Sequence, residues 1–362
     1  MKGYEKKINM HRLNRVYYFD SLRAMACLMV VIIHVGAVYI NKDFGSLNFW
    51  VGNILVSLSR IAVPVFVMIS GALMLDENYV CTGKKIAKHI GKLILFFFFW
   101  SFASCFLFEI AIPVLKKQPL DYYKIFTEIV QGPYHLWFIY MIIGLYLIVP
   151  ILRLLIRTEN KKIIEYFLVL SFIFTFFFGE MVRVGGYFSN VFVFLNDHLF
   201  KEIGMQFVGG YTAYFILGWY LHNYEITHKK LLYGLGIGGF VYTVLSSYIF
   251  SMLAGESVIS SNNLSLNILF QTVTVFLLFK ERDKKCGAKE TVSAKLIGLI
   301  AKHSLGVYAL HVIIFTTILD VFIKIGLTNA LIAIPLNVIF SFVASLFISF
   351  ILSKMPLIKK VV

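Results

Sequence analysis

The chain has 362 residues, of which 59% are hydrophobic, 17% are aromatic and 15% are charged. A water-soluble domain has about 45–50% apolar and about 25% charged residues, so this composition and a mean hydropathy of +0.81 exclude an ordinary soluble protein. The net charge of +15 suggests a nucleic-acid partner only if the basic residues gather in one patch. The four cysteines have no histidine or cysteine neighbours at ligand spacing, so we expect neither disulfides nor a metal site.

Apolar runs long enough to cross a bilayer occur about ten times along the chain. The sequence therefore predicts an all-α polytopic membrane protein, with residues 1–362 forming a single transmembrane domain. We place the spans near residues 17–40, 50–74, 90–112, 134–155, 163–179, 205–222, 231–253, 264–280, 303–323 and 330–353.

The lysine and arginine residues predict the orientation of these spans. With ten spans, 24 of the 34 basic residues lie on the side of the two termini, seven lie on the opposite side and three lie within spans. Cytoplasmic loops carry an excess of Lys and Arg, so we expect both termini in the cytoplasm. The positive charge is then a topology signal, and no nucleic-acid partner is expected.

The first span, 17–40, carries Asp20, Arg23 and His34 within its length. A charge at the bilayer centre costs roughly 2.5–3.5 kcal/mol on insertion scales, so such residues usually face a protein interior and have a function. Arg23 and His34 are 11 residues apart, which puts them about 20° apart in direction and about 16 Å apart along a helix. We expect Arg23 in the inner half of the bilayer and His34 in the outer half. A lone histidine that only packs is the alternative.

The second span, 50–74, contains Arg60 at a depth comparable with that of His34. Arg60 could form a structural ion pair, hold an anionic or polar substrate, or stabilise an oxyanion. Ser70 and Gly71 have no base beside them in the sequence, so we interpret them as a close-packing site rather than a nucleophile.

Three lysines, Lys85, Lys88 and Lys92, share one face at the start of the third span. One interpretation is that they anchor the protein to lipid phosphates. The other is that they bind the phosphates of an anionic cytosolic cofactor.

Further polar residues lie in the fourth and ninth spans. His135 and Trp137 open the fourth span from the outer side, where an aromatic belt explains Trp137 without any function. His135, at the depth expected for His34, favours a polar outer chamber. In the ninth span, 303–323, Tyr308 and His311 lie one turn apart, and the topology puts His311 in the inner half. They could also be a buried hydrogen-bonded pair.

Four sequence blocks together resemble the acyltransferase family 3 membrane proteins. The first is Arg23-x10-His34 with Asp20 three residues earlier, and the second runs from Ser59-Arg60 through Pro64 to Ser70-Gly71. The third is His135-Leu136-Trp137-Phe138 through Pro150, and the fourth is Ser304-Leu305-Gly306-x-Tyr308-x-x-His311. The blocks occur in family order and cover most of the chain. The polysaccharide O-acetyltransferases, such as the enterobacterial common antigen enzyme, are the most similar group.

The chain departs from the family pattern at two places. Many members have a Glu five residues after the conserved Trp, where this chain has Ile142. Their cytoplasmic Arg-x-x-Arg is here Lys85-x-x-Lys88, and lysine supplies charge without a bidentate fork.

The resemblance implies a bacterial inner-membrane enzyme that moves acetyl from cytosolic acetyl-CoA to a hydroxyl of an extracytoplasmic or lipid-linked glycan. We expect His34 to act as the base and Arg23 to contact the thioester donor, with Lys85, Lys88 and Lys92 also binding the cofactor. Supporting roles are expected for Asp20, Arg60, His135, Trp137, Tyr308 and His311. A histidine that carries the acetyl group covalently is an open alternative. The rival function is a transporter or flippase of a glycan or lipid. The expected partners are the glycan acceptor and membrane lipids.

Overall fold

The structure is a computed structural model that describes residues 16–40, 43–157, 161–195, 198, 209–258, 262–286, 291–356, 358–359 and 361. The basic residues expected at the N-terminus before Val16, together with Lys42 and Lys201, lie outside this part of the chain. The described residues form helices and contain no strand, which confirms an all-α protein. The helices are α1 (Tyr17–Ala37), α2 (Leu47–Ser59), α3 (Ala62–Met74), α4 (Gly83–Cys105), η1 (Phe106–Ala111), α5 (Ile112–Leu115), α6 (Tyr122–Gln131), η2 (Tyr134–Leu136), α7 (Trp137–Arg157), α8 (Lys161–Ser171), η3 (Phe172–Phe177), α9 (Phe178–Gly185), α10 (Asn190–Leu195), α11 (Tyr211–Asn223), α12 (Lys229–Ala254), α13 (Leu266–Cys286), α14 (Val292–Lys324) and α15 (Ala330–Leu352).

Eight helices or continuous helix pairs in the described residues are long and apolar enough to cross a membrane, which confirms a polytopic membrane protein. They are Tyr17–Ala37, Leu47–Met74, Gly83–Leu115, Tyr122–Ile156, Lys161–Gly185, Lys229–Ala254, Val292–Lys324 and Ala330–Leu352. The other two expected spans, 205–222 and 264–280, correspond to α11 and α13, and residues 205–208 of the first lie outside the described part of the chain. Because α11 has only 13 residues, it is about 20 Å long and too short to cross alone. The number of passes and the side of each terminus stay predictions.

The short α13 also differs from a simple span. It has 21 residues, and its last turns carry six consecutive charged residues from Lys280 to Lys285. Lys280 is buried and donates to the Leu221 and Tyr224 carbonyls, and the other five charges belong in water or at the membrane surface. The apolar part of α13 therefore covers less than a full bilayer.

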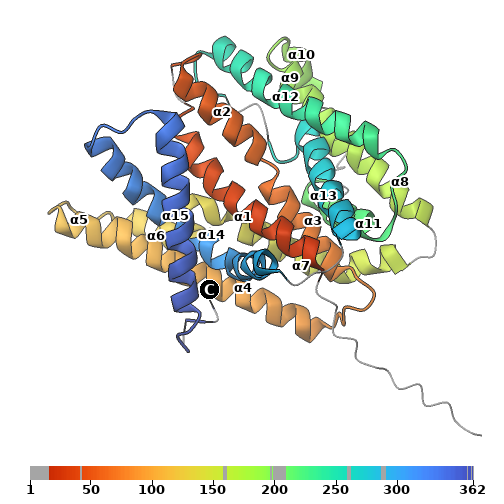
Figure 1. The fold of residues 1–362 in the computed structure, drawn as a ribbon, viewed down its shortest axis with the longest axis horizontal. Helices are drawn as coiled ribbons and strands as arrows, with labels where there is room; N and C mark the ends of the chain where they lie inside the picture. The colour runs from red at the N-terminus through yellow and green to blue at the C-terminus, as the bar shows by residue number, and fades with distance from the viewer. Residues whose placement is uncertain are drawn as a thin grey trace, which may run out of the picture.

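Helix α1 lies at the centre of the molecule, with α14 and α15 on one side and α3 and α13 on the other (Figure 1). Its fully buried residues divide between two hydrophobic clusters. Leu22 and Ala26 pack with α3 and α13, whereas Val31 and Val35 pack with α14 and α15. A helix buried on several faces is positioned tightly, so the polar residues of α1 are held in defined places.

Helices α3 and α11 pack backbone against backbone. A Cβ atom on Gly71 would lie 1.8 Å from the carbonyl oxygen of Phe215, and one on Gly218 would lie 2.1 Å from that of Met68. This confirms the close-packing interpretation of Gly71. The Ser70 hydroxyl donates a hydrogen bond to the Phe66 carbonyl at 2.9 Å, as expected for a structural serine.

Several helices begin or break in one region of the molecule. The α2–α3 pair is interrupted at Arg60 and Ile61, and α11 begins after Gly210, whose φ is +64°. The turn before α13 is tied to α11, because Asn263 Nδ2 donates to the Tyr211 hydroxyl at 3.0 Å. Non-helical backbone at membrane depth is tolerated where it lines a cavity or is buried in protein. This is the region in which the candidate site lies.

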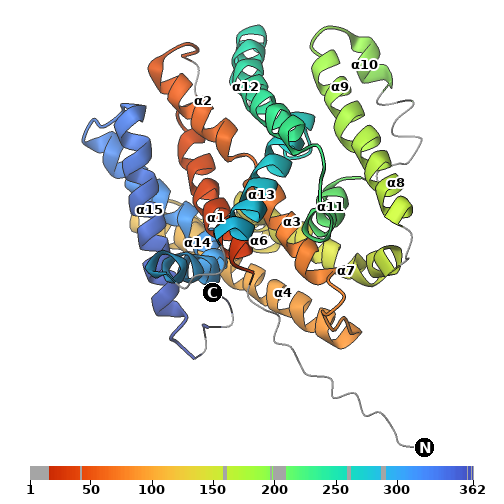
Figure 2. The same cartoon turned by 45° about the vertical axis from the view of Figure 1, so that its right-hand side comes forward.

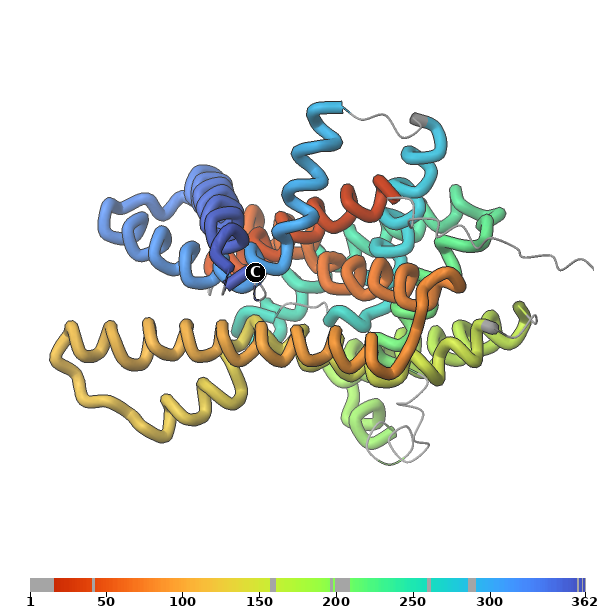
Figure 3. Tube along the Cα trace, turned by 90° about the horizontal axis from the view of Figure 1, so that it is seen from below, coloured from red at the N-terminus to blue at the C-terminus, as the bar shows by residue number. Residues whose placement is uncertain are grey.

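Two helical hairpins extend from this body. The segment from α4 through α6 projects at one end, where it forms the long orange and yellow arm of Figure 3. The hairpin of α8 with α9 and α10 stands at the opposite edge, as Figure 2 shows. Neither hairpin contributes a residue to the cluster described next.

Candidate active site

Three histidines from distant parts of the sequence meet at the centre of the structure. His34 lies in the last turn of α1, His135 in η2 and His311 in the middle of α14. The ring centroids of His34 and His311 are 5.1 Å apart, and those of His135 and His311 are 5.5 Å apart. We call these residues the histidine cluster.

His311 is the fully buried member of the cluster. Its Nδ1 donates to backbone carbonyl oxygens of its own helix, at 2.8 Å to Tyr308 and 3.2 Å to Val307. Carbonyls only accept hydrogen bonds, so in the neutral ring Nε2 keeps the lone pair. Within the described residues that Nε2 has no hydrogen-bond partner. The backbone of α14 therefore fixes both the tautomer and the orientation of this ring.

His135 is held by Tyr308. The Tyr308 hydroxyl donates a hydrogen bond to the backbone carbonyl of His135, and the two rings are 5.8 Å apart. Since only 3% of His135 is exposed, its ring is a buried wall of the cluster. Tyr308 thus positions η2 against α14 and has no contact with His34 among those described.

His34 is the accessible member of the cluster. It is half-buried, and its Nδ1 lies 3.4 Å from the hydroxyl of Tyr134, a residue that is 64% exposed. The ring of Phe315 stacks beside it at 6.4 Å. Of the three histidines, His34 is therefore the one with a largely exposed polar neighbour at its ring nitrogen.

Arg60 brings a positive charge to the cluster from the break between α2 and α3. It lies close enough to His34 and to the Tyr211 hydroxyl for electrostatic interaction. Its Nε is buried and has no hydrogen-bond partner among the described residues. Trp137 lies next to Tyr211, with the two ring centroids 5.8 Å apart. A guanidinium in such a place can stabilise negative charge that develops on a substrate oxygen.

The expected depth of His311 was wrong. The topology put His311 in the inner half of the bilayer and His34 in the outer half, but rings 5.1 Å apart share one depth. The cause is that α14 begins at Val292, eleven residues before the expected span. His311 consequently lies further along its helix than the span 303–323 implied.

Arg23 occupies the other end of α1. Its guanidinium lies 3.9 Å from the Asp20 carboxylate, and both residues line a cavity of about 460 Å³. The opposite wall comes from α14 and carries Lys295 and Lys302. Three basic side chains around one cavity fit an anionic ligand.

Lys295 and Lys302 were missed as site residues because the sequence suggested that they lie in a loop. They are seven residues apart, which is two turns, so they share a face once α14 is extended to Val292. A prediction that residues 292–302 are helical would have placed both lysines on one helix face.

Lys85, Lys88 and Lys92 lie exposed on the first turns of α4. Lys85 Nζ lies over the Tyr79 ring, 4.6 Å from its centroid. The cavity at Arg23 is lined by Lys295 and Lys302 and not by these three lysines.

Among the described residues, no group of three or more histidine, cysteine, aspartate or glutamate side chains could hold a metal ion.

The helical bundle combines a buried histidine cluster with a separate basic cavity. This arrangement fits a class of membrane enzyme and does not identify a particular substrate. Residues 16–354 match the family described as "Acyltransferase domain", so the chain belongs to acyltransferase family 3. This confirms the resemblance found in the four sequence blocks, and the protein is an integral membrane acyltransferase. No protein with a curated description and no solved structure matches the chain.

Proposed function

We propose that this acyltransferase moves an acetyl group from cytosolic acetyl-CoA to a hydroxyl of an extracytoplasmic or lipid-linked glycan, in the inner membrane of a bacterium. The observation that supports this best is the layout of α1. One continuous helix carries Arg23 at a basic cavity and His34 at the histidine cluster.

The distance between these two places suits a thioester donor. Arg23 and His34 are separated by 11 residues of helix, or about 16 Å. An extended pantetheine arm spans such a distance, so CoA phosphates near Arg23, Lys295 and Lys302 would leave the thioester near His34. The exposed lysines of α4 would then act on the nucleotide outside the cavity or on lipid phosphates.

The proposed chemistry uses His34 as a general base. Its imidazole takes the proton of the acceptor hydroxyl while the hydroxyl oxygen attacks the thioester carbon. The Arg60 guanidinium stabilises the negative charge on the tetrahedral oxygen. The C–S bond then breaks, and the proton passes from His34 to the departing thiolate, which leaves as CoA thiol.

A covalent route through the same imidazole gives the same products. In that route a His34 nitrogen attacks the thioester carbon, CoA thiol leaves, and the acyl group then passes to the acceptor. Rapid quench into denaturant at neutral pH with radiolabelled acetyl-CoA separates the routes, because only the covalent one leaves label on the protein in the absence of acceptor.

The donor half of the proposal can be tested without knowing the glycan. The full chain in detergent is mixed with acetyl-CoA, and released CoA thiol is measured with a thiol reagent. We expect slow hydrolysis that His34→Ala abolishes, while His228→Ala, a substitution of an exposed histidine outside the cluster, leaves it unchanged. Normal thiol release by folded His34→Ala protein would refute the role of His34.

The acceptor half requires cells. Mass spectrometry of surface glycan from a deletion strain should show the loss of acetyl groups, and the wild-type gene should restore them. The rival function, transport without acyl transfer, predicts that the glycan is lost from the surface as a whole. Membership of an acyltransferase family favours the first outcome.

A further inference from the structure

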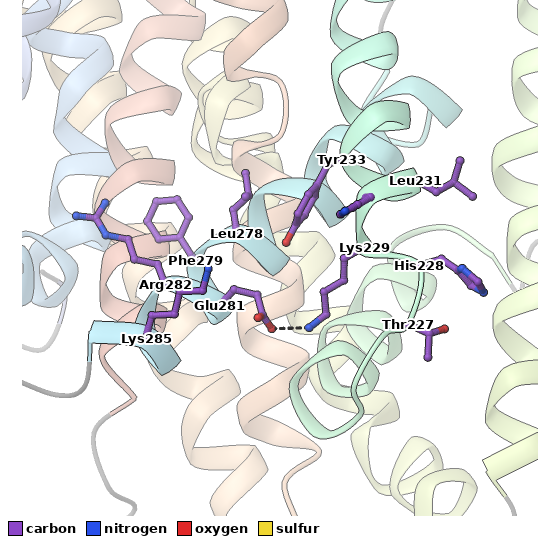
Figure 4. A pocket seen from close by; sticks show the side chains of 11 residues that line it. Thr227, His228, Lys229, Leu231, Tyr233, Leu278, Phe279, Glu281, Arg282 and Lys285 are labelled. Atoms are coloured by element: carbon purple, nitrogen blue, oxygen red, sulfur yellow. Dashed lines mark hydrogen bonds and ion pairs between the residues drawn. The ribbon is translucent and has the colours of Figure 1, made fainter.

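A further basic cavity shares no lining residue with the cavity at Arg23 or with the histidine cluster. It measures about 1010 Å³ and lies between the start of α12 and the end of α13 (Figure 4). Its lining comes from the turn before α12, from the first residues of that helix and from the last turns of α13. These residues are Thr227, His228, Lys229, Lys230, Leu231, Tyr233, Leu278, Phe279, Glu281, Arg282 and Lys285.

The charge of this cavity is strongly positive. Glu281 is its one carboxylate, and that group is paired with Lys229, whose Nζ lies 2.8 Å from Glu281 Oε1. Figure 4 shows this pair between the two helices. Within the described residues no acidic side chain pairs with Lys230, Arg282 or Lys285, and all three are exposed. The cavity therefore carries a surplus of three positive charges.

The same cavity has an apolar wall. Leu231 is 63% exposed and Leu278 is 47% exposed, and Phe279 and Tyr233 also line the cavity. A free phosphate or a nucleotide gains nothing from exposed leucines, whereas the hydrocarbon chain of a lipid covers them. Basic groups at a membrane surface attract anionic lipids. The lining thus matches a ligand with both a phosphate and an apolar chain.

We infer that this cavity binds the head group of an anionic phospholipid. Arg282, Lys285 and Lys230 contact the phosphate, and the acyl chain passes along Leu231 and Leu278 toward the exposed face of α12. The volume has room for a head group rather than a single ion, since ligand pockets measure about 300–1,000 Å³. The inference stands apart from the acyl-transfer proposal, because the lipid is a ligand and not a substrate.

Native mass spectrometry of the detergent-purified full chain tests the site. The protein is titrated with phosphatidylglycerol and, separately, with phosphatidylcholine that has the same acyl chains. We expect bound phosphatidylglycerol at concentrations at which phosphatidylcholine is absent. The double variant R282Q/K285Q should bind phosphatidylglycerol roughly tenfold more weakly. K116Q/K117Q, which removes two exposed lysines elsewhere, should bind it like the wild type.

Two outcomes overturn the inference. One is equal phosphatidylglycerol binding by R282Q/K285Q and the wild type. The other is displacement of the lipid by glycerol 3-phosphate at matched concentration, since this shows that a free phosphate ester is enough and that the apolar wall has no role. Because Arg282 and Lys285 are exposed, gel filtration should show that the double variant keeps the wild-type elution volume.

Discussion

The imidazole of His311 lies 5.1 Å from that of His34, with its own orientation set by hydrogen bonds to α14 carbonyls. The ring of His311 is buried and its tautomer is fixed, and the more accessible ring of His34 packs against it. This arrangement gives His34 the contact with substrate and His311 a positioning role.

The first prediction separates these two roles. His34→Ala should reduce acyl transfer by about 10²–10⁴-fold, the range expected for loss of a general base. His311→Asn should lower kcat less and leave the KM for acetyl-CoA unchanged, while altering the apparent pKa of the pH–rate profile. Because His311 acts through His34, the double variant should be no slower than His34→Ala. Additive losses would contradict the assignment.

The sequence predicted part of this site well. Arg23 and His34 could be related because they share one helix, where spacing alone determines direction and height. The meeting of His34 with His135 and His311 could not be derived in this way, since it depends on how three separate helices pack. The depth error for His311 has a specific cause: the predicted span began at residue 303, whereas α14 begins at Val292, so Lys295 and Lys302 counted as loop residues and not as part of the helix that lines the cavity.

For the fold as well, the sequence predicted one part and tertiary packing determined the other. Apolar run length correctly predicted a bundle of membrane helices, but it also suggested that α11 is a full span. Hydropathy does not record that α11 is 13 residues long or that its start, after Gly210, lies beside the turn that contains Asn263. Tertiary contacts decide where a helix begins inside a protein that spans a membrane.

The second prediction concerns Tyr134, which was not singled out as a site residue. Its hydroxyl lies 3.4 Å from His34 Nδ1, so Tyr134→Phe removes one polar neighbour and keeps the ring. A typical hydrogen bond contributes about 0.5–1.5 kcal/mol, which corresponds to a loss of roughly two- to tenfold in kcat. Tyr140→Phe, in α7 directly after η2, removes a hydroxyl that donates to the Val130 carbonyl; it is the matched control and should keep wild-type activity.

The third prediction concerns the basic cavity. Arg23→Gln and the pair Lys295→Gln/Lys302→Gln should each raise the KM for acetyl-CoA, because they remove positive charge from the walls around the donor. Added salt should weaken donor binding by the wild type more than by the variants. Lys116→Gln/Lys117→Gln is the control in the same assay. If the KM of all these proteins is equal, the donor phosphates bind elsewhere, and the α4 lysines become the next candidates.

The fourth prediction concerns stability at the α3–α11 contact. Gly71→Ala places a Cβ 1.8 Å from the Phe215 carbonyl oxygen, so the two helices must separate. Overpacking of this kind typically costs about 1–3 kcal/mol, and thermal unfolding in detergent should occur at a lower temperature. Gly144→Ala has no atom within 4 Å of the new Cβ and should be neutral or stabilising. Equal melting temperatures for the two variants would show that α11 is not tightly packed on α3.

The fifth prediction concerns Glu225, which lies in the turn between α11 and α12 and beside the charged end of α13. Its carboxylate contacts Lys284, Lys229 and Lys280, with the Lys229 Nζ at 3.3 Å and the Lys280 Nζ at 3.4 Å. These ammonium groups, Lys284 first, lower the pKa of Glu225 to about 2. A carboxyl whose pKa is lower in the folded state stabilises the fold above its unfolded pKa of about 4.3 and loses this contribution as the pH falls toward 2.

Glu225→Gln should therefore lower the melting temperature slightly at pH 7, and the difference from the wild type should shrink as the pH falls below about 4.3. The effect is small because Glu225 is largely exposed and the ion pairs are screened by water and salt. Glu77→Gln, a substitution of an exposed carboxylate in the turn after α3, is the control for removal of a carboxylate from the surface and should keep the wild-type melting temperature at pH 7. A Glu225→Gln deficit that stays constant from pH 7 to pH 3 would mean that the side chain stabilises this end of the bundle by packing and not by charge.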